Sequence, residues 1–225
     1  MHIFYANRGT FTIVFTNSRF DLSWRSQNPE VARESWRKVK KMLGLQELNT
    51  AYLTQTHSNI IRKVKKPGYQ GPGDGLYSFQ KEIALTVLTA DCLPVVLTDP
   101  QTGFCAVLHC GWKPLAKGIL NNLPKIFQRH NINPNNISAF LGPCIDQCCY
   151  QVGSEFLKIF PERFFITKDS RLYFSLKQFV TEQLVKMGIK SITRVELCTC
   201  CSSLYFSYRG ERCTQRQATF VIKRC

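Results

Sequence analysis

The chain has 225 residues, of which 44% are hydrophobic and 20% are charged, and its formal net charge is +15. This composition is that of an ordinary globular domain and excludes a disordered chain, and no apolar run approaches the roughly 20 residues of a membrane-spanning helix. The first residues, Met1-His2-Ile3-Phe4, lack the basic and apolar stretches of a signal peptide, so we expect a cytoplasmic protein without a membrane partner.

The 30 basic residues favour anionic partners, but they are spread along the chain. Small basic clusters occur at 37–41 and 62–66, and no helix-turn-helix, RNA-recognition or zinc-finger motif accompanies them. We therefore expect a solvated positive surface and no nucleic-acid partner. The sequence does not indicate the oligomeric state.

Turn residues and hydrophobic patterning predict the elements of the first third of the chain. A helix is expected from Glu30 to Leu43, because Pro29 suits the first helical position and Gly44 can end the helix. The glycines and prolines of 66–75 predict a loop. Strands are expected at 11–16, 51–54 and 58–65.

Three apolar runs follow, at 83–89, 93–98 and 104–109. They lack a clean alternation of apolar and polar residues, which is typical of strands that are buried on both faces. Cys92 falls between the first two runs, and His109 ends the third. Side chains at the ends of buried strands are held rigidly while they face a cleft, so both are candidate site residues.

The second half of the chain is expected to mix helices with strands. A helix over 115–129 should be disturbed at Pro124, Ser154 should cap a short helix that ends near Phe160, and Gly188 should end a helix over 175–187. Further strands are expected at 137–141, 191–198, 204–208 and 218–223. These elements predict an α+β fold, a layered α/β sandwich with a mixed sheet, as a single domain over residues 1–225.

Two histidines and one cysteine lie in short motifs at the expected strand ends. The motifs are Gln55-Thr56-His57, Asp91-Cys92-Leu93-Pro94 and His109-Cys110-Gly111-Trp112. Two imidazoles and a thiolate suit zinc, and three protein ligands leave the fourth tetrahedral position open for catalysis. Their spacing is not diagnostic, so from the residues alone a zinc site and structural histidines both remain open.

The chain has 11 cysteines, which we expect to be reduced. Cys198, Cys200 and Cys201 form a cluster near the C-terminus, and Cys144, Cys148 and Cys149 offer further thiols. A second, all-thiolate zinc site and an incidental cluster of buried cysteines are both open, because the spacing is not that of a zinc ribbon.

Lys113, in Gly111-Trp112-Lys113, is the candidate phosphate-binding residue. Its ammonium group would act as a point charge, and the N-terminus of the following helix would add backbone amides. No Walker or dinucleotide-binding glycine motif is present.

Eight segments, in order over residues 55–222, carry a resemblance to a known family: QTHSNI, GDGL, LTADCLPVVLTDP, AVLHCGW, LGPCI, CYQVG, SYRG and RQATFVI. Together they resemble the laccase-domain family, once called polyphenol oxidases. The resemblance implies a zinc-dependent purine nucleoside enzyme, with purine nucleosides and phosphate as partners. It implies phosphorolysis of adenosine, inosine, guanosine and methylthioadenosine, deamination of adenosine, and His57, Cys92 and His109 as metal ligands.

The chain departs from the family pattern where phosphate would bind. The family usually has Arg and Gly after the tryptophan, where this chain has Lys113 and Pro114. Near the C-terminus the family's SYRR becomes SYRG, which ends at Gly210, and TGR becomes TQR, which ends at Arg216. Arginine grips phosphate through two parallel hydrogen bonds and lysine does not, so the departures bear on phosphorolysis.

The zinc hypothesis gives a role to each candidate. Zinc in such a site lowers the pKa of its bound water toward about 7, so hydroxide is available at neutral pH. This hydroxide would attack C6 of adenine. Asp91 is the candidate catalytic residue that moves protons, or else it supports the turn beside Cys92. For phosphorolysis, phosphate near Lys113 would attack the anomeric carbon of the ribose. The rings that would either stack on the base or belong to the core are Tyr150, Phe206 and Tyr208.

Three alternatives compete with the zinc hypothesis. Cys92 as nucleophile with His109 as base would make a metal-free Cys–His amidase, which suits the editing of peptidoglycan precursors linked to bacterial relatives of the family. A copper polyphenol oxidase is disfavoured, because the chain has only four histidines and no methionine near the motifs to serve as an axial copper ligand. The third alternative is a module that binds without catalysis.

Overall fold

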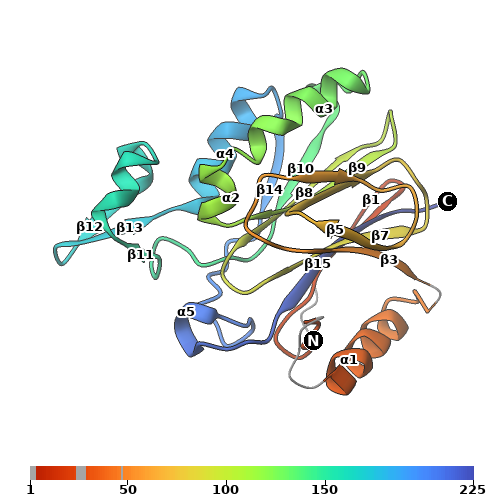
Figure 1. Cartoon of the computed structure of the whole chain (residues 1–225), viewed down its shortest axis with the longest axis horizontal. Helices are drawn as coiled ribbons and strands as arrows, with labels where there is room; N and C mark the ends of the chain where they lie inside the picture. The colour runs from red at the N-terminus through yellow and green to blue at the C-terminus, as the bar shows by residue number, and fades with distance from the viewer. Residues whose placement is uncertain (1–3, 24–28, 47) are drawn as a thin grey trace.

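The computed structural model describes residues 4–23, 29–46 and 48–225, and two six-stranded sheets form its centre (Figure 1). The first sheet has the strands, in spatial order, β1 (Phe4–Arg8), β2 (Phe11–Phe15), β15 (Gln217–Lys223), β7 (Ile83–Thr89), β3 (Asn49–Thr54) and β5 (Gly68–Pro72). The second has β14 (Ser191–Arg194), β10 (Ser138–Leu141), β8 (Leu93–Asp99), β9 (Phe104–Cys110), β6 (Gly75–Ser78) and β4 (Ile61–Lys63). Each of these sheets contains both parallel and antiparallel pairs, as the predicted mixed sheet requires.

The two large sheets pack face to face around a shared apolar core. Ile13, Val87 and Val221 of the first sheet meet Val96 and Val107 of the second in one buried cluster. Because β-branched side chains fill a pleated surface well, this interior holds the two sheets together as a sandwich.

Helices cover the outer faces of the sandwich. On the second sheet lie α2 (Trp112–Ala116), α3 (Leu123–Arg129) and α4 (Leu176–Lys186), and on the first lies α1 (Pro29–Met42). Trp36 and Val39 of α1 pack with Phe220 of β15 in a separate cluster. Figure 1 shows α1 on the opposite side of the sheets from the other three helices. The predicted layered α+β class is therefore confirmed.

The three apolar runs form the strands β7, β8 and β9, as predicted. Every residue of β8 and β9 is buried, which explains the missing alternation. β8 and β9 are antiparallel neighbours in which Leu93 pairs with Cys110 and Pro94 with His109. This register places Cys92, which directly precedes Leu93, at the same end of the strand pair as His109.

Other predictions are confirmed with shifted ends. Strands form at the expected 11–16, 51–54, 137–141 and 218–223, and α1 and α4 occupy the two expected long helices. Gly44 and Gly188 follow these helices with φ of 65° and 93°, the left-handed conformation that glycine adopts at helix ends. The strands expected at 58–65 and 191–198 shrink to the short β4 and β14.

Several predictions were wrong, and the structure gives a reason in most cases. The expected loop at 66–75 contains β5, because its backbone pairs with β3 despite the glycines. The expected helix over 115–129 breaks at Gly118, where φ is 77°, so that a 3-10 turn, η1 (Leu120–Asn122), precedes α3. Pro124 is tolerated in the first turn of α3, where it costs no hydrogen bond. The expected strand at 204–208 is absent, and α5 (Tyr208–Glu211) begins there.

A small sheet projects from the sandwich on one side (Figure 1). Its strands, in spatial order, are β11 (Gln151–Val152), β13 (Arg171–Phe174) and β12 (Phe165–Lys168). The 3-10 helices η3 (Ser154–Lys158) and η4 (Glu162–Phe164) precede β12, and η2 (Pro134–Asn136) precedes β10. Gly153, not Ser154, is the N-cap residue of η3, and no side chain caps it. The prediction that Ser154 caps this helix was therefore wrong.

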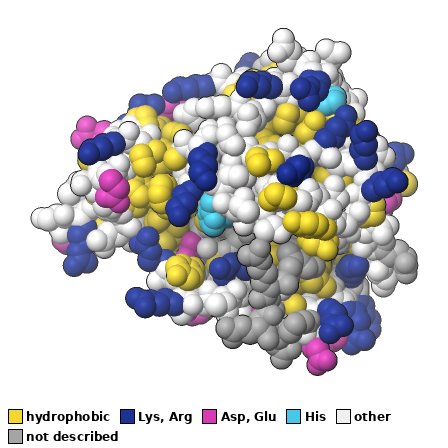
Figure 2. Space-filling view, in the orientation of Figure 1, with side chains coloured by type: hydrophobic (Ala, Val, Ile, Leu, Met, Phe, Trp, Pro, Cys, Tyr) yellow, Lys and Arg dark blue, Asp and Glu magenta, His cyan; other side chains and the backbone are white. Residues whose placement is uncertain are grey.

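The surface charge and the character of the helices can be compared with the expectations of a solvated positive surface and of no membrane partner. Figure 2 shows lysine and arginine side chains scattered over the visible face, in agreement with the predicted solvated positive surface. Within the described part of the chain, no helix combines the length and the apolar character needed to cross a bilayer.

Ser175 and Ser154 stand at the starts of two helices and allow a test of capping. Ser175 is buried and its hydroxyl accepts a hydrogen bond from the Gln178 backbone N–H at the start of α4, whereas Ser154 makes no such bond. We expect Ser175→Ala to lower the free energy of unfolding by about 1 kcal/mol and Ser154→Ala to change it by less than about 0.5 kcal/mol. Urea denaturation of both variants measures the difference, and equal effects would contradict the assignment of the cap.

Candidate metal centre

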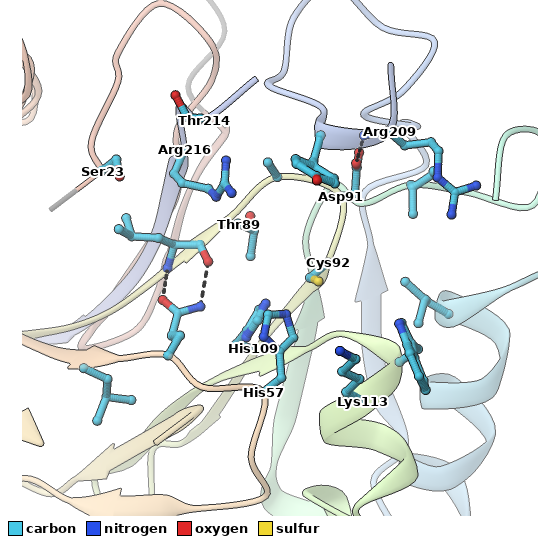
Figure 3. A pocket seen from close by; sticks show the side chains of 18 of the residues that line it. Ser23, His57, Thr89, Asp91, Cys92, His109, Lys113, Arg209, Thr214 and Arg216 are labelled. Atoms are coloured by element: carbon cyan, nitrogen blue, oxygen red, sulfur yellow. Dashed lines mark hydrogen bonds between the residues drawn. The ribbon is translucent and has the colours of Figure 1, made fainter. Parts of the chain in front are cut away.

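Three donor side chains that are far apart in the sequence meet near the ends of strands β3, β8 and β9. They belong to His57, Cys92 and His109. Their ligand atoms all lie within 4.8 Å of one another. The two imidazole rings have centroids 5.0 Å apart and an edge-on arrangement. Figure 3 shows the three side chains pointing toward one another. The sequence-predicted ligand set is therefore brought together in space.

Asp74 fixes the orientation of His109. Its carboxylate oxygen Oδ1 lies 2.8 Å from Nδ1 of the imidazole, and its carbonyl accepts a hydrogen bond from the His109 backbone N–H at 2.7 Å. Both side chains are buried, so water does not compete for these bonds. Since Nδ1 is engaged by the carboxylate, Nε2 is the ring nitrogen that remains for a metal ion.

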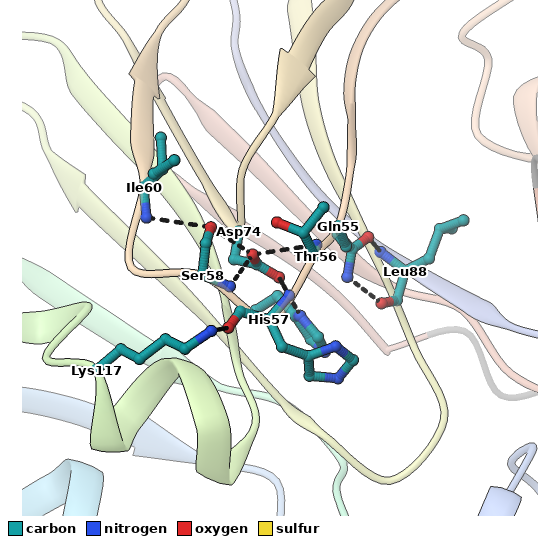
Figure 4. Close-up of polar contacts among 9 residues, drawn as sticks. Gln55, Thr56, His57, Ser58, Ile60, Asp74, Leu88 and Lys117 are labelled. Carbon is teal, nitrogen blue, oxygen red and sulfur yellow. Dashed lines mark hydrogen bonds and ion pairs between the residues drawn. The ribbon is translucent and has the colours of Figure 1, made fainter.

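The same carboxylate also shapes the turn that carries His57 (Figure 4). Its oxygens accept backbone N–H bonds from Thr56 at 3.2 Å, from His57 at 3.1 Å and from Ser58, whose hydroxyl also donates at 2.7 Å. His57 has a φ of 53°, a left-handed conformation that is uncommon for a residue with a side chain. The hydrogen bonds to Asp74 hold this turn in place.

Two further contacts anchor the His57 segment. The Gln55 amide donates to the Leu88 carbonyl at 2.7 Å and accepts from the Leu88 N–H at 2.8 Å, which ties the end of β3 to β7. On the other side, the Lys117 ammonium group donates to the carbonyl of His57 at 2.7 Å. Figure 4 shows both contacts on either side of the histidine.

Gly111 leaves the space that Cys92 needs. A Cβ atom at this position would lie 2.6 Å from the Cys92 Sγ atom, which is far inside a van der Waals contact. A side chain there would force the sulfur away from the two imidazoles. The glycine after His109-Cys110 is therefore explained by the close approach of the thiol.

Charge at the centre favours the thiolate form of Cys92. Burial alone would raise its pKa, but the charge of His109 and hydrogen bonds from His109 and His57 lower the pKa to about 6. Burial alone would lower the pKa of His109, but the charge of Cys92 and the hydrogen bond to Asp74 raise it to about 9. At neutral pH the thiol is therefore ionised, which is the state in which cysteine is both a metal ligand and a nucleophile.

Asp74 is ionised as well. Burial opposes its ionisation, but hydrogen bonds and charge from His109, together with hydrogen bonds from Ser58, lower the pKa from 3.8 to about 2. Because the pKa is lower in the folded state than in the unfolded chain, the ionised carboxylate stabilises the fold above about pH 4. This contribution is lost as the pH falls toward 2.

A cavity of about 750 Å³ opens onto the three donor side chains. Lys113, Arg209 and Arg216 line it, and within the described residues no carboxylate forms an ion pair with any of these three side chains. In the view of Figure 3, Arg216 lies on one side of the histidine and cysteine cluster and Lys113 on the other. The two guanidinium groups donate to backbone carbonyls, Arg209 to Gln151 and Arg216 to Cys213 and Gln215, so the cavity offers positive charge that no described carboxylate neutralises.

Aromatic rings also line the cavity. They include Trp112, Tyr150 and Tyr208, but not Phe206, so two of the three predicted stacking residues reach the cavity. The Arg209 guanidinium lies 5.4 Å from the centre of the Tyr150 ring. A flat ligand can therefore find both apolar surface and positive charge here.

Asp91 lines the same cavity, and its carboxylate already has three hydrogen-bond donors. Its carboxylate accepts hydrogen bonds of 2.7 Å from the Thr199 hydroxyl, the Ser207 hydroxyl and the Arg209 backbone N–H. These contacts draw the C-terminal segment, including Arg209, toward Cys92. They favour the interpretation of Asp91 as a residue that supports the site over that of a proton carrier.

Asp74, in the GDGL segment, was not predicted as a site residue. The available signal was the pair of glycines that flank Asp74, because glycine is typical of positions where other atoms approach the backbone closely. A Cβ atom on Gly75 would lie 2.6 Å from Leu108, and one on Gly73 would lie 3.2 Å from the Ile60 carbonyl oxygen. Arg209 and Arg216 were named only as members of motifs that depart from the family at Gly210 and Gln215, and both line the cavity.

Replacing Asp74 separates its role in orientation from its role in packing. An amide has one acceptor oxygen where the carboxylate has two, so Asp74→Asn cannot satisfy all the donors around it. We expect zinc affinity, measured by competition with a chromophoric chelator, to fall by about 10- to 100-fold.

Asp99→Asn is the matched control. Asp99 is also fully buried, and it accepts hydrogen bonds from the Gln101 N–H at 2.9 Å and the Thr102 hydroxyl at 2.6 Å, in the turn after β8. It should lower the free energy of unfolding and leave zinc affinity unchanged. An equal loss of zinc affinity in both variants would contradict the role of Asp74.

Comparison with known proteins agrees with this architecture. A purine nucleoside phosphorylase of Aquifex aeolicus is 32% identical over 169 residues, which cover 75% of this chain and 80% of that protein. One from Clostridium acetobutylicum is 29% identical over 223 residues, with 95% and 92% covered. The crystal structure of YlmD from Geobacillus stearothermophilus superposes with a TM-score of 0.88 at 25% identity, and covers 96% of this chain and 93% of that one.

The family match spans almost the whole chain. The family model described as multi-copper polyphenol oxidoreductase laccase matches residues 4–224. This range contains the three donor side chains and the residues that orient them. The chain therefore belongs to this laccase-like family, whose curated relatives are named purine nucleoside phosphorylases.

Proposed function

We propose that the protein is a zinc-dependent purine nucleoside phosphorylase. The observation that carries the proposal is that one cavity is lined by the three soft donor side chains, by cations that no described carboxylate neutralises, and by aromatic rings. Its volume of about 750 Å³ lies in the range of small-molecule sites. The names of the relatives support the same activity.

His57, Cys92 and His109 would hold the zinc ion. The thiolate state of Cys92 and the free Nε2 of His109 suit a borderline-soft divalent cation, and three protein ligands leave one position open. Zinc, when bound, would supply a Lewis acid beside the cavity. Copper in a blue-copper centre usually takes an axial methionine, and neither Met42 nor Met187 lines the cavity, while Met1 lies outside the described residues. The donor set therefore supports zinc over a copper oxidase.

Phosphate would be bound by the cations of the cavity. Lys113 and Arg216 lie on opposite sides of the donor cluster in Figure 3, and Arg209 lies at the wall formed by the C-terminal segment. In phosphorolysis, an oxygen of hydrogen phosphate attacks the anomeric carbon of the ribose, the bond between that carbon and the base nitrogen breaks, and the proton lost by the hydrogen phosphate ends on the leaving base. Fixed positive charge stabilises the phosphate in the orientation for attack.

The base would lie against aromatic rings. Tyr150 and Tyr208 line the cavity, and the Tyr208 side chain is among the more exposed of the large hydrophobic residues, at 59%. An exposed ring at the mouth of a cavity is available to stack on a purine, which fits adenosine, inosine, guanosine and methylthioadenosine alike. The cavity therefore supports the purine class and does not select one base.

We propose adenosine deamination as a second reaction of the same site. It requires a group that moves protons beside C6 of the base, and Asp91 is the candidate from the sequence. Because its carboxylate already accepts three hydrogen bonds, the contacts of Asp91 support deamination less directly than the cations support phosphorolysis.

One observation favours a second candidate, the Cys–His amidase. The lowered pKa of Cys92 and the raised pKa of His109 describe a thiolate beside an imidazolium, with Asp74 bonded to the far side of the ring. This order of nucleophile, base and carboxylate also suits covalent catalysis without a metal. Activity that survives complete removal of zinc, together with inactivation by alkylation of Cys92, would favour the amidase.

Incubation with adenosine, with and without phosphate, separates the reactions. We expect adenine to form only when phosphate is present, because phosphate is the attacking group, and inosine to form in either case if deamination occurs. Cys92→Ala should abolish both products, and Cys225→Ser, which changes an exposed thiol outside the cavity, should abolish neither. Chromatography of the products provides the measurement, and adenine in the absence of phosphate would contradict phosphorolysis.

Lys113 gives a test of the phosphate site. Since a charge-assisted contact contributes about 1.5 kcal/mol or more, we expect Lys113→Ala to raise the KM for phosphate by about tenfold or more. Lys113→Arg should retain or lower the KM, because arginine can bind phosphate through two hydrogen bonds.

Lys125→Ala, which changes an exposed lysine on α3, is the matched control and should leave this KM unchanged. Steady-state rates at varied phosphate measure all three variants. A KM that is equal in wild type and Lys113→Ala would remove Lys113 from the phosphate site.

A further inference from the structure

Four cysteine sulfurs gather at a second place in the molecule. The Sγ atoms of Cys148, Cys149, Cys198 and Cys201 all lie within 4.8 Å of one another. Cys148 and Cys149 belong to the turn that follows β10, and Cys198 and Cys201 to a turn between β14 and α5. None of the four is among the described residues that line the cavity of the metal centre.

The spacing of the sulfurs suits one tetrahedral ion. Zinc–sulfur bonds of about 2.3 Å place the corners of a tetrahedron about 3.8 Å apart. The Sγ atoms of Cys148 and Cys201 are 3.9 Å apart. A disulfide would need about 2.0 Å, so these two sulfurs stand at the separation of metal ligands.

Backbone contacts hold the two turns side by side. Cys144 and Cys198 form an isolated parallel bridge, and the Thr199 N–H donates to the Cys144 carbonyl at 3.0 Å. Within the first turn, the Cys149 N–H donates to the Asp146 carbonyl at 2.9 Å. The thiols therefore converge through the fold itself.

One of the sulfurs lies in a nest of backbone donors. The Asp146 N–H points to the Cys198 Sγ at 3.3 Å. Burial alone would raise the pKa of Cys198, but hydrogen bonds from the N–H groups of Asp146, Cys201 and Cys200 lower it. Such donors stabilise a thiolate, the form that binds metal ions.

A buried cation connects the same two turns. The side chain of Lys177 is only 2% exposed, and its ammonium group lies 2.8 Å from a carboxylate oxygen of Asp146 and 3.2 Å from the Leu197 carbonyl oxygen. It thus contacts the segment before each pair of cysteines. Lys177 therefore ties the two segments together at a buried point, and Glu196 is its second carboxylate partner at 3.9 Å.

We propose that Cys148, Cys149, Cys198 and Cys201 bind a second zinc ion in a closed site with four thiolate ligands. On binding, each thiol that is still protonated releases its proton to solvent as its Zn–S bond forms. The site is structural, since four protein ligands leave no position for a substrate. It would fix the turn from which Thr199 donates to Asp91, beside the first metal centre.

The number of zinc ions per chain tests this proposal independently of the enzyme activity. Protein is purified without oxygen in the presence of a reductant, and zinc is measured by plasma mass spectrometry. We expect about two ions in the wild type, about one in Cys92→Ala, and about one in Cys148→Ser/Cys201→Ser. Both cysteines of the double variant are exposed, so serine replaces them with little effect on packing. Cys225→Ser, another exposed thiol, is the control and should keep about two ions.

Cobalt provides a second readout. In Cys92→Ala, which retains only the proposed site, Co²⁺ should produce the strong sulfur-to-cobalt charge-transfer absorption of a tetrathiolate complex. The same spectrum should be absent when Cys148→Ser/Cys201→Ser is added to Cys92→Ala. The proposal is overturned if Cys148→Ser/Cys201→Ser retains all the zinc of the wild type, if Cys92→Ala binds neither zinc nor cobalt, or if mass spectrometry shows a Cys148–Cys201 disulfide in the anaerobic protein.

Discussion

The candidate metal centre depends on one buried carboxylate. Asp74 binds the imidazole of His109 and the backbone N–H groups of the turn that carries His57, so a single side chain sets the positions of two of the three donors. These segments come from different sheets, β9 in one case and the end of β3 in the other. The sandwich brings the segments together, and Asp74 converts their proximity into a defined geometry.

The third donor is tied to the C-terminal part of the chain. Asp91, directly before Cys92, accepts hydrogen bonds from Thr199, Ser207 and the Arg209 N–H. The backbone turn at Asp91 and Cys92 therefore supports both the donor cluster, through Cys92, and the C-terminal wall of the cavity, through Asp91. Cys198 of the four-cysteine cluster directly precedes Thr199, so an ion bound there would restrict the turn from which Thr199 donates to Asp91. In this way a site with no open position could still affect how the cavity is shaped.

Much of the fold and the donor set could be predicted from the sequence, because both depend on patterns that are local or typical. Continuous apolar runs indicated β7, β8 and β9, and the strand-end positions of Cys92 and His109 followed from them. The strand β5 was missed because its stability comes from pairing with β3, which is not visible in its glycines. Asp74 was missed for a similar reason, since its role exists only when residues 56–58 and 109 surround it.

The charges of the site favour the state with a bound divalent cation over the state without one. At neutral pH the low pKa values of Asp74 and Cys92 leave two buried negative charges, and the raised pKa of His109 leaves one positive charge between them. The group thus carries a net negative charge, which burial makes costly. A divalent ion that displaces the proton of His109 would compensate both anions and preserve the hydrogen bond to Asp74. The thiolate–imidazolium pair that resembles a cysteine nucleophile is thereby also the state expected of a metal site before its ion binds.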